Sequence, residues 1–226
     1  MYKKSKFSPK EKYTDDKKLP QKTSWGHVAK WYDNSVKERG HYYHTHLVLP
    51  NVLQLLYLKD GDSLLDIACG QGVLARRIPK TVSYAGVDIS DELINTARKY
   101  DTVKNHTYFV GDVTKGMPYI KDKFTHATIV LALQNMDKPI LALKNASEKM
   151  ETGGRLVIVL NHPCFRIPRQ SGWEIDEHTK TQKRWINRYL SSLTIPINMH
   201  PSKQNRGAVT WSFHFSLSTL SISLQA

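Results

Sequence analysis

Two glycines that follow an aspartate-bearing apolar segment are the residues best suited to hold a ligand. Residues 63–72 read S-L-L-D-I-A-C-G-Q-G, and Gly70, Gly72 and Ala75 fit the pattern G-x-G-x-x-G/A. In this pattern the first glycine permits a tight turn, the second lets the backbone approach a ligand, and the small third residue lets a helix pack on the strand. The spacing therefore predicts a strand, a turn and a helix, with a ligand bound over the turn.

A second aspartate narrows the chemistry of that ligand. Asp88 ends the segment V-S-Y-A-G-V-D, about 20 residues beyond the glycine turn, where an acid can accept hydrogen bonds from ribose hydroxyls. We therefore expect an adenosine-like ribose, for which NAD is one candidate. Asp66 precedes the glycines, and its carboxylate would repel a pyrophosphate and favour a cationic ligand.

Three ordered motifs carry a family resemblance. L-L-D-I-A-C-G-Q-G, G-V-D-I-S and V-G-D-V together resemble the class I S-adenosylmethionine (SAM)-dependent methyltransferases, in the branch that includes the quinone-biosynthesis enzymes. The resemblance implies that Asp66 neutralises the methionine ammonium, Asp88 binds the ribose and Asp112 meets the adenine amino group. The full set of cofactor-binding residues that it implies is Asp66, Ala68, Gly70, Gly72, Asp88, Ile89, Asp112, Val113, Leu131 and Tyr32. The alternative is an α/β domain in which three strands end in an aspartate by chance.

An α/β fold must position these residues. We predict a Rossmann-like, doubly wound, mostly parallel sheet with helices on both faces, an N-terminal helical extension and a lid insertion after the fifth strand. Residues 124–133 are almost continuously apolar, as is typical of a strand covered on both faces. Strands are expected to begin at Leu64 and to span 82–88, 106–110, 124–133 and 155–160. Helices are expected over 27–32, 47–58 and 140–150 and from Val73 and Ser90, with Gly153 and Gly154 as the turn after residue 150.

Residues that can bind the methyl acceptor follow the fourth and fifth strands, since open α/β sheets bind their ligands at the carboxyl ends of the strands. Gln134 and Asn135 follow the fourth strand and are substrate candidates. His162 follows the fifth and is either a general base or a residue that fixes the shape of its loop. Asn161 is the second catalytic candidate.

Further substrate candidates lie in the same loop and before the first strand. Arg166 and Arg169 either bind a carboxylate or phosphate of the substrate or pair with Glu174 and Asp176. In the resembling family the region before the first strand covers the cofactor and substrate. This implies that Tyr32 and Tyr43 line the pocket, with ordinary packing of aromatic residues as the alternative.

The last third of the chain departs from the family pattern. Residues 162–208 are expected to form a substrate-side insertion, in which 181–193 is an amphipathic lid helix or a self-association surface. Residues 211–215 alternate like a strand, and we favour a helix over a strand for 217–226. The expected sheet therefore lacks its last two strands and has an exposed edge beside the fifth.

The length and composition of the chain limit its domain organisation, its compartment and its partners. The chain has 226 residues and a net charge of +13, which fits a basic disordered arm over 1–23 and a methyltransferase domain over 24–226. The arm is either a solvated tail or a contact for nucleic acid. Two cysteines favour a reducing compartment, and the absence of a signal peptide or membrane-spanning segment predicts a cytoplasmic protein. The spacing of His41, His44 and His46 does not favour a metal site, and we expect none.

The sequence thus predicts a SAM-dependent methyltransferase that acts on an O, N or C nucleophile of a small-molecule acceptor. Two alternatives remain at this point. One is an RNA or protein methyltransferase that uses the basic arm, and the other is an inactive SAM-binding or interaction protein. The identity of the acceptor and the oligomeric state are not predicted.

Overall fold

The computed structural model describes residues 42–198 and 209–225. Five strands form one parallel sheet in the order β3-β2-β1-β4-β5, which confirms the predicted Rossmann-like class. The strands of this sheet are β1 (Ser63–Ile67), β2 (Ser83–Asp88), β3 (His106–Val110), β4 (Phe124–Val130) and β5 (Met150–Val159). The expected basic arm, the helix at 27–32, Tyr32 and His41 lie outside the described residues.

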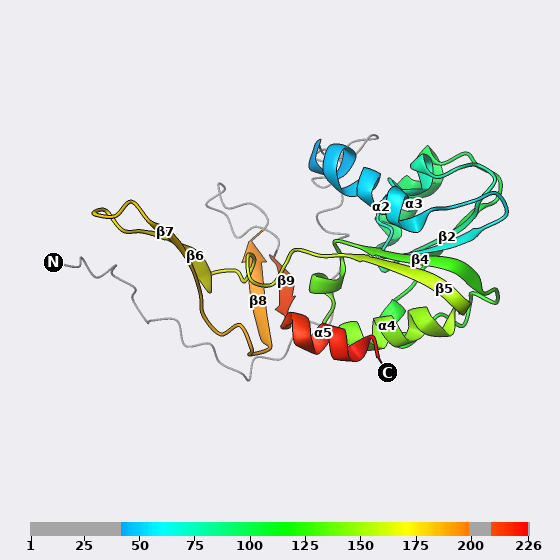
Figure 1. Cartoon of the computed structure of the whole chain (residues 1–226). Helices are drawn as coiled ribbons and strands as arrows, with labels where there is room; N and C mark the ends of the chain where they lie inside the picture. Colours follow the sequence, from blue (N-terminus) through cyan, green and yellow to red (C-terminus); the bar gives the residue numbers. More distant parts are fainter. Residues whose placement is uncertain (1–41, 199–208, 226) are drawn as a thin grey trace.

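Helices cover both faces of the sheet. The helices α2 (Leu49–Leu56) and α3 (Asp91–Tyr100) lie on one face, and α4 (Pro139–Glu148) and α5 (Leu217–Ser223) lie on the other (Figure 1). Short helical turns complete the set: η2 (His44–Val48), η3 (Ala75–Arg77), η4 (Val113–Lys115) and η5 (Leu133–Asn135). Ser90 caps α3 by accepting the Leu93 N–H at 3.2 Å, as its position before two acids predicts.

Strand alternation divides the core into two layers. In β1, Leu65 and Ile67 pack among residues of α4 and α5, whereas Leu64 packs among residues of α2 and α3. Because successive side chains point to opposite faces, Asp66 faces the α2 and α3 layer together with Leu64. A carboxyl therefore enters an otherwise apolar layer directly below the glycine turn.

The helix predicted from Val73 is only the short turn η3. Ile78, which follows it, is extended with ψ 158° because it precedes Pro79, and a proline disfavours helical geometry in the residue before it. Gly153 and Gly154 likewise differ from the prediction. Helix α4 ends at Glu148, and both glycines lie within β5, where the pairing with β4 shifts register between Phe124 and His126.

The predicted lid helix over 181–193 is wrong. Residues 182–186 form strand β7 (Gln182–Ile186), which pairs antiparallel with β6 (Ser171–Ile175). A Cβ on Gly172 would lie 2.8 Å from the Trp185 ring, so the bare glycine makes room for the indole across the hairpin. Gly172 lies outside residues 181–193, so the spacing of apolar residues within that segment does not reveal the pairing. The hairpin extends away from the main sheet (Figure 1).

The strand predicted at 211–215 and the helix favoured over 217–226 are present at the end of the described chain, whereas the strand that pairs with 211–215 was not predicted. A second antiparallel pair joins β8 (Leu193–Asn198) to β9 (Val209–His214), and α5 follows directly. Leu220 of α5 is buried against the core on the α4 face. The chain from β8 to α5 thus lies beside the carboxyl ends of β4 and β5.

Candidate active site

The glycine turn after β1 is built from left-handed backbone. Ala68, Gly70 and Gly72 have φ values of 58°, 57° and 71°, a conformation that costs about 1–2 kcal/mol for a residue with a Cβ. A Cβ on Gly70 would meet no atom within 4 Å, whereas one on Gly72 would lie 2.8 Å from the Tyr108 hydroxyl. The turn therefore leaves open space above Gly70 and is tightly packed below Gly72.

Asp88 at the end of β2 holds this turn from the side. Its Oδ2 accepts the Gly70 N–H at 2.9 Å, and its Oδ1 accepts the Ser90 N–H at 2.9 Å. Burial raises the pKa of the Asp88 carboxyl, and these backbone donors partly oppose the rise. The carboxylate thus joins the glycine turn to the start of α3 and keeps lone pairs for a further donor.

Asp66 is buried beneath the turn. Its Oδ2 accepts a hydrogen bond from the Tyr84 hydroxyl and its Oδ1 one from the Thr128 hydroxyl, each at 2.8 Å. Burial raises the pKa of Asp66 to about 6. Its predicted contact with a methionine ammonium stays a prediction, and the structure shows its carboxyl engaged by two neighbouring strands.

Two polar residues, Asp112 and Tyr119, lie close to the end of β3. Asp112 caps η4 by accepting from the Thr114 N–H at 3.0 Å. Although burial raises its pKa, hydrogen bonds from Thr114 and Lys115 bring the net value below the usual range. Beside it, the hydroxyl of Tyr119 is buried with no hydrogen-bond partner among the described residues and occupies the space that a Cβ on Gly111 would fill. Val113 is buried, and Ile89, after β2, is 43% exposed.

Leu131, at the end of β4, is also left-handed, with φ 52°. Its N–H donates to Val159 O at 2.7 Å, and its own carbonyl accepts from Gln134 Nε2 at 2.7 Å. Backbone strain in a residue with a Cβ persists only where its surroundings fix it. Here β5 and the Gln134 amide fix it.

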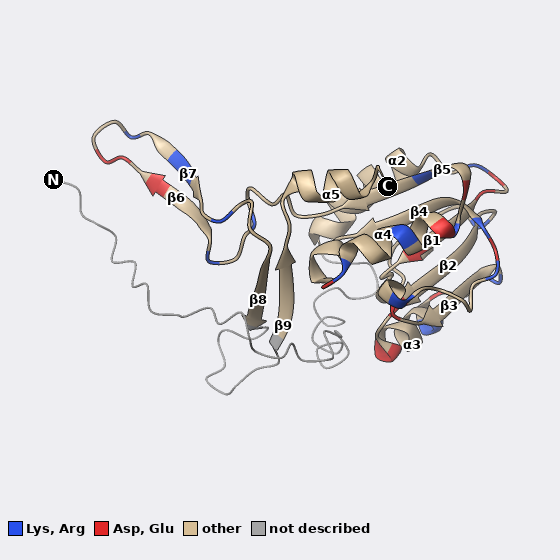
Figure 2. Cartoon of the chain, turned by 90° about the horizontal axis from the view of Figure 1, so that it is seen from below, with Lys and Arg blue, Asp and Glu red and all other residues tan. Residues whose placement is uncertain are grey.

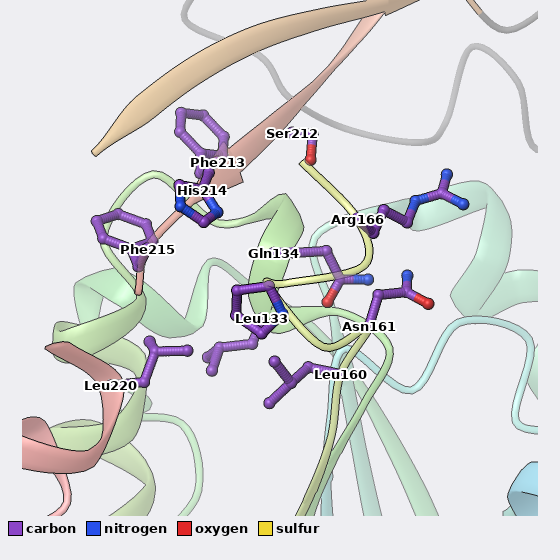
Figure 3. Close-up of a pocket in the computed structure, with 11 residues that line it drawn as sticks. Leu133, Gln134, Leu160, Asn161, Arg166, Ser212, Phe213, His214, Phe215 and Leu220 are labelled. Atoms are coloured by element: carbon purple, nitrogen blue, oxygen red, sulfur yellow. The ribbon is translucent and has the colours of Figure 1, made fainter. Parts of the chain in front are cut away.

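A pocket lies beyond Leu131 at the carboxyl ends of β4 and β5. Its volume of about 30 Å³ holds about two water molecules, so it can take the end of a small molecule. Figure 3 shows its lining side chains, with the amides of Gln134 and Asn161 and the guanidinium of Arg166 directed to one side. The lining residues are Leu133, Gln134, Leu160, Asn161, Pro163, Arg166, Ser212, Phe213, His214, Phe215 and Leu220.

The predicted substrate residues thus fall into two groups. Gln134, Asn161 and Arg166 come together in this pocket, whereas Asn135, Tyr43 and Arg169 are not among its lining residues. Tyr43 precedes η2 and is 47% exposed. Arg169 donates to Pro196 O at 3.1 Å. His162 also lies outside the lining; it is exposed, and its Nδ1 accepts the Cys164 N–H at 3.2 Å.

Strand β9 supplies the side chains that sequence reasoning missed. Ser212, Phe213 and His214 line the pocket, although they lie some 50 residues after Asn161 in the chain. His214 is buried, and its Nε2 lies 2.8 Å from the carbonyl oxygen of Tyr189. Since a carbonyl can only accept, Nε2 carries the proton. A polar His between two Phe residues at the end of a strand was the available signal.

Two other kinds of feature are absent from the described residues. Within 42–198 and 209–225, no group of three or more His, Cys, Asp or Glu side chains has the arrangement of a metal site. No helix in the same ranges has the length and apolar character needed to cross a bilayer. His46 instead bonds to the backbone of its own turn, at Tyr42 O.

Comparisons with known proteins agree on the central part of the chain. The family described as "Methyltransferase domain" matches residues 65–158. A demethylmenaquinone methyltransferase of Staphylococcus haemolyticus is 23% identical over 125 residues, covering 53% of this chain and 52% of that protein. A Staphylococcus aureus protein of the same name is 25% identical over the same shares. The chain therefore spans about half the length of these curated relatives.

Solved structures show the same fold over a longer stretch. An S-adenosylmethionine-dependent methyltransferase from Mesorhizobium loti superposes with a TM-score of 0.62 at 24% identity, covering 78% of this chain and 77% of that one. One described as a putative S-adenosylmethionine-dependent methyltransferase, from Listeria monocytogenes, gives 0.60 at 20% identity, with 78% and 81% covered.

Proposed function

Residues 65–158 match the family described as "Methyltransferase domain", and we propose that the protein is a class I SAM-dependent methyltransferase that transfers the methyl group of SAM to an O, N or C atom of a small molecule. One observation carries the proposal. The glycine turn, Asp88, Asp112 and Leu131 lie at the carboxyl ends of four neighbouring strands, and a pocket with polar side chains lies directly beyond Leu131.

The residues present fit SAM. The space above Gly70 is open, and the carboxyls of Asp66 and Asp88 give the site a negative charge that suits a cationic ligand. The Tyr119 hydroxyl beside Asp112 is a buried polar atom without a partner in the described chain, and a bound adenine would supply one. We infer that Asp88 holds the ribose and that Asp112 and Tyr119 hold the adenine.

The protein's contribution to the reaction is position. When bound, SAM would supply a sulfonium methyl group to the acceptor, its sulfur would keep the electron pair of the broken carbon–sulfur bond, and the acceptor would lose a proton to solvent. Such a transfer requires alignment and exclusion of water more than covalent help from the protein. Leu131, fixed in a strained conformation and bonded to Gln134, joins the cofactor side to the acceptor pocket and is suited to set that alignment.

Calorimetry with S-adenosylhomocysteine, the demethylated product of SAM, tests the proposal. We expect the wild type to bind it with micromolar affinity and Asp88→Ala to lose at least about tenfold, because two backbone donors and the ribose lose their acceptor. Asp91→Ala removes a nearby acid that is exposed and should bind like the wild type.

The outcomes separate the three readings of the sequence. A folded wild type that binds neither SAM nor S-adenosylhomocysteine would refute the proposal. Binding without turnover on any acceptor would favour the inactive SAM-binding protein. Methylation of RNA or protein, but of no small molecule, would favour the alternative that uses the basic arm.

A further inference from the structure

The acceptor pocket carries positive charge and no carboxylate. Among its lining residues Arg166 is a permanent cation, Gln134, Asn161 and Ser212 are neutral and polar, and no Asp or Glu is present. The remaining lining is apolar, apart from His214. A pocket of this composition attracts an anion and repels a cation.

The guanidinium of Arg166 is available for that anion. It has no hydrogen-bond or ion-pair partner among residues 42–198 and 209–225. No acid of the adjacent hairpin forms an ion pair with it in the described chain. Glu174 lies opposite Lys183 in the register of β6 and β7, and Asp176 accepts the N–H groups of His178 and Thr179 at 2.9 and 3.0 Å. Figure 2 shows acidic residues on the β6 side of this hairpin and basic residues on the β7 side.

Gln134 provides the second element of recognition. Its Nε2 donates to Leu131 O, so the orientation of the amide is fixed. Its Oε1 is buried with no partner in the described part of the chain, and an unsatisfied buried acceptor is costly until a donor arrives. The side chain therefore offers a hydrogen-bond acceptor to whatever enters the pocket, next to the residue that joins the two sides of the site.

We propose that this pocket selects a small anionic acceptor, one that carries a carboxylate or phosphate together with the O–H or N–H group to be methylated. Arg166 binds the anion, assisted by the Asn161 amide, and Gln134 Oε1 accepts from the O–H or N–H. This assignment rests on the proposed methyltransferase function and specifies its substrate class. It differs from a neutral acceptor such as a quinol, which would leave the exposed guanidinium of Arg166 to water.

Matched acceptor pairs test the inference. The probes are 4-hydroxybenzoate with 4-hydroxybenzamide and 2-aminobenzoate with 2-aminobenzamide, measured for binding to the S-adenosylhomocysteine complex and for methylation with SAM. In the wild type we expect the acids to bind at least about tenfold more tightly than their amides. Arg166→Gln should remove this preference, while its affinity for S-adenosylhomocysteine stays within about twofold of the wild type.

Two further variants separate the roles. Arg169→Gln removes a cation of the same loop that bonds to Pro196 O outside the pocket lining, and it should keep the preference for acids. Gln134→Leu should weaken acids and amides by equal factors, because both present the same O–H or N–H.

Equal binding of acids and amides by the wild type would overturn the inference. So would a complex with S-adenosylhomocysteine that binds none of the acids at concentrations up to about 10 mM, or an Arg166→Gln variant that keeps the preference. Failure of the proposed function is recognised separately, because the wild type would then not bind S-adenosylhomocysteine at all.

Discussion

The proposed cofactor side and the proposed acceptor side of the site are built by different means. On the cofactor side, backbone groups and buried carboxyls are bonded to one another, as Asp88 is to the N–H groups of Gly70 and Ser90. On the acceptor side, polar side chains stand without protein partners, as the guanidinium of Arg166 and Oε1 of Gln134 do within the described chain. Apart from the Tyr119 hydroxyl, the first side is preformed, and the second is completed by its ligand.

The difference follows from the task of each side. A cofactor that is the same in every turnover is best held by a rigid frame, because the binding groups are already ordered in the folded protein and lose little further entropy on binding. An acceptor is selected by charge and hydrogen bonding, which side chains supply. Substitutions on the cofactor side should therefore lower both stability and cofactor affinity. Substitutions on the acceptor side can lower stability while cofactor affinity stays unchanged.

The largest effect is expected from Gly72→Ala. The new Cβ would lie 2.8 Å from the Tyr108 hydroxyl at φ 71°, and strain and overpacking together should cost about 4 kcal/mol of unfolding free energy. Chemical denaturation measures this loss. Gly70→Ala is the matched control: at φ 57° with no atom within 4 Å, it should cost only about 1 kcal/mol. Equal losses would show that the turn is not packed as described.

The next effect is a pH dependence from Asp66. Burial raises its pKa to about 6 in the folded protein, so the folded state holds the proton more tightly than the unfolded state. Ionisation of this carboxyl therefore lowers stability as the pH rises from about 4 to about 6, by a total of about 3 kcal/mol. Unfolding curves across that range should show that the unfolding free energy of Asp66→Asn rises relative to that of the wild type as the pH rises. Parallel pH profiles of the two proteins would contradict the assignment.

A smaller loss of stability, without a loss of cofactor affinity, is expected from His214→Ala. The variant loses a buried ring and the hydrogen bond to Tyr189 O, which should cost about 2 kcal/mol of stability. Because His214 lies on the acceptor side, affinity for S-adenosylhomocysteine should remain within about twofold of the wild type. Calorimetry and thermal unfolding provide the two readouts. A large loss of cofactor affinity would show that the two sides are coupled.

The smallest expected effect is a gain in stability from Ala68→Gly. Ala68→Gly removes the strain of a left-handed residue at φ 58°, which outweighs the added entropy of the unfolded chain and should raise stability by about 0.5 kcal/mol. Ala146→Gly in the ordinary helix α4 is the control, and it should lose about 1 kcal/mol. A loss in both variants would indicate that the turn carries no strain at Ala68.

The sequence predicts the fold and the cofactor side because both are local. The glycine pair, the aspartates that end β2 and follow β3, and the serine cap of α3 are each recognised from a few neighbouring residues, even where the contact is distant, as that of Asp88 with Gly70 is. The apolar run of β4 likewise predicts its central place in the sheet. The resemblance to class I methyltransferases rests on these same segments.

The acceptor side was predicted only in part, because it depends on long-range pairing. Gln134, Asn161 and Arg166 were found from their position after β4 and β5, but His214 reaches the pocket only through the pairing of β8 with β9. The hairpin was misread as a helix because Trp185 packs on Gly172 across two strands. A local spacing of apolar residues cannot reveal such a partner.

Leu131 divides the chain as well as the site. The residues proposed to hold the cofactor come no later than Leu131, and the residues that line the acceptor pocket begin at Leu133. A recombination event at this point would exchange the acceptor-binding segments and keep the residues proposed to hold the cofactor, provided that the new segment again supplies a strand to pair with β4 and a donor to the Leu131 carbonyl. The order of the segments thus makes the domain modular, and chimeras joined after Leu131 are a direct route to methyltransferases with new acceptors.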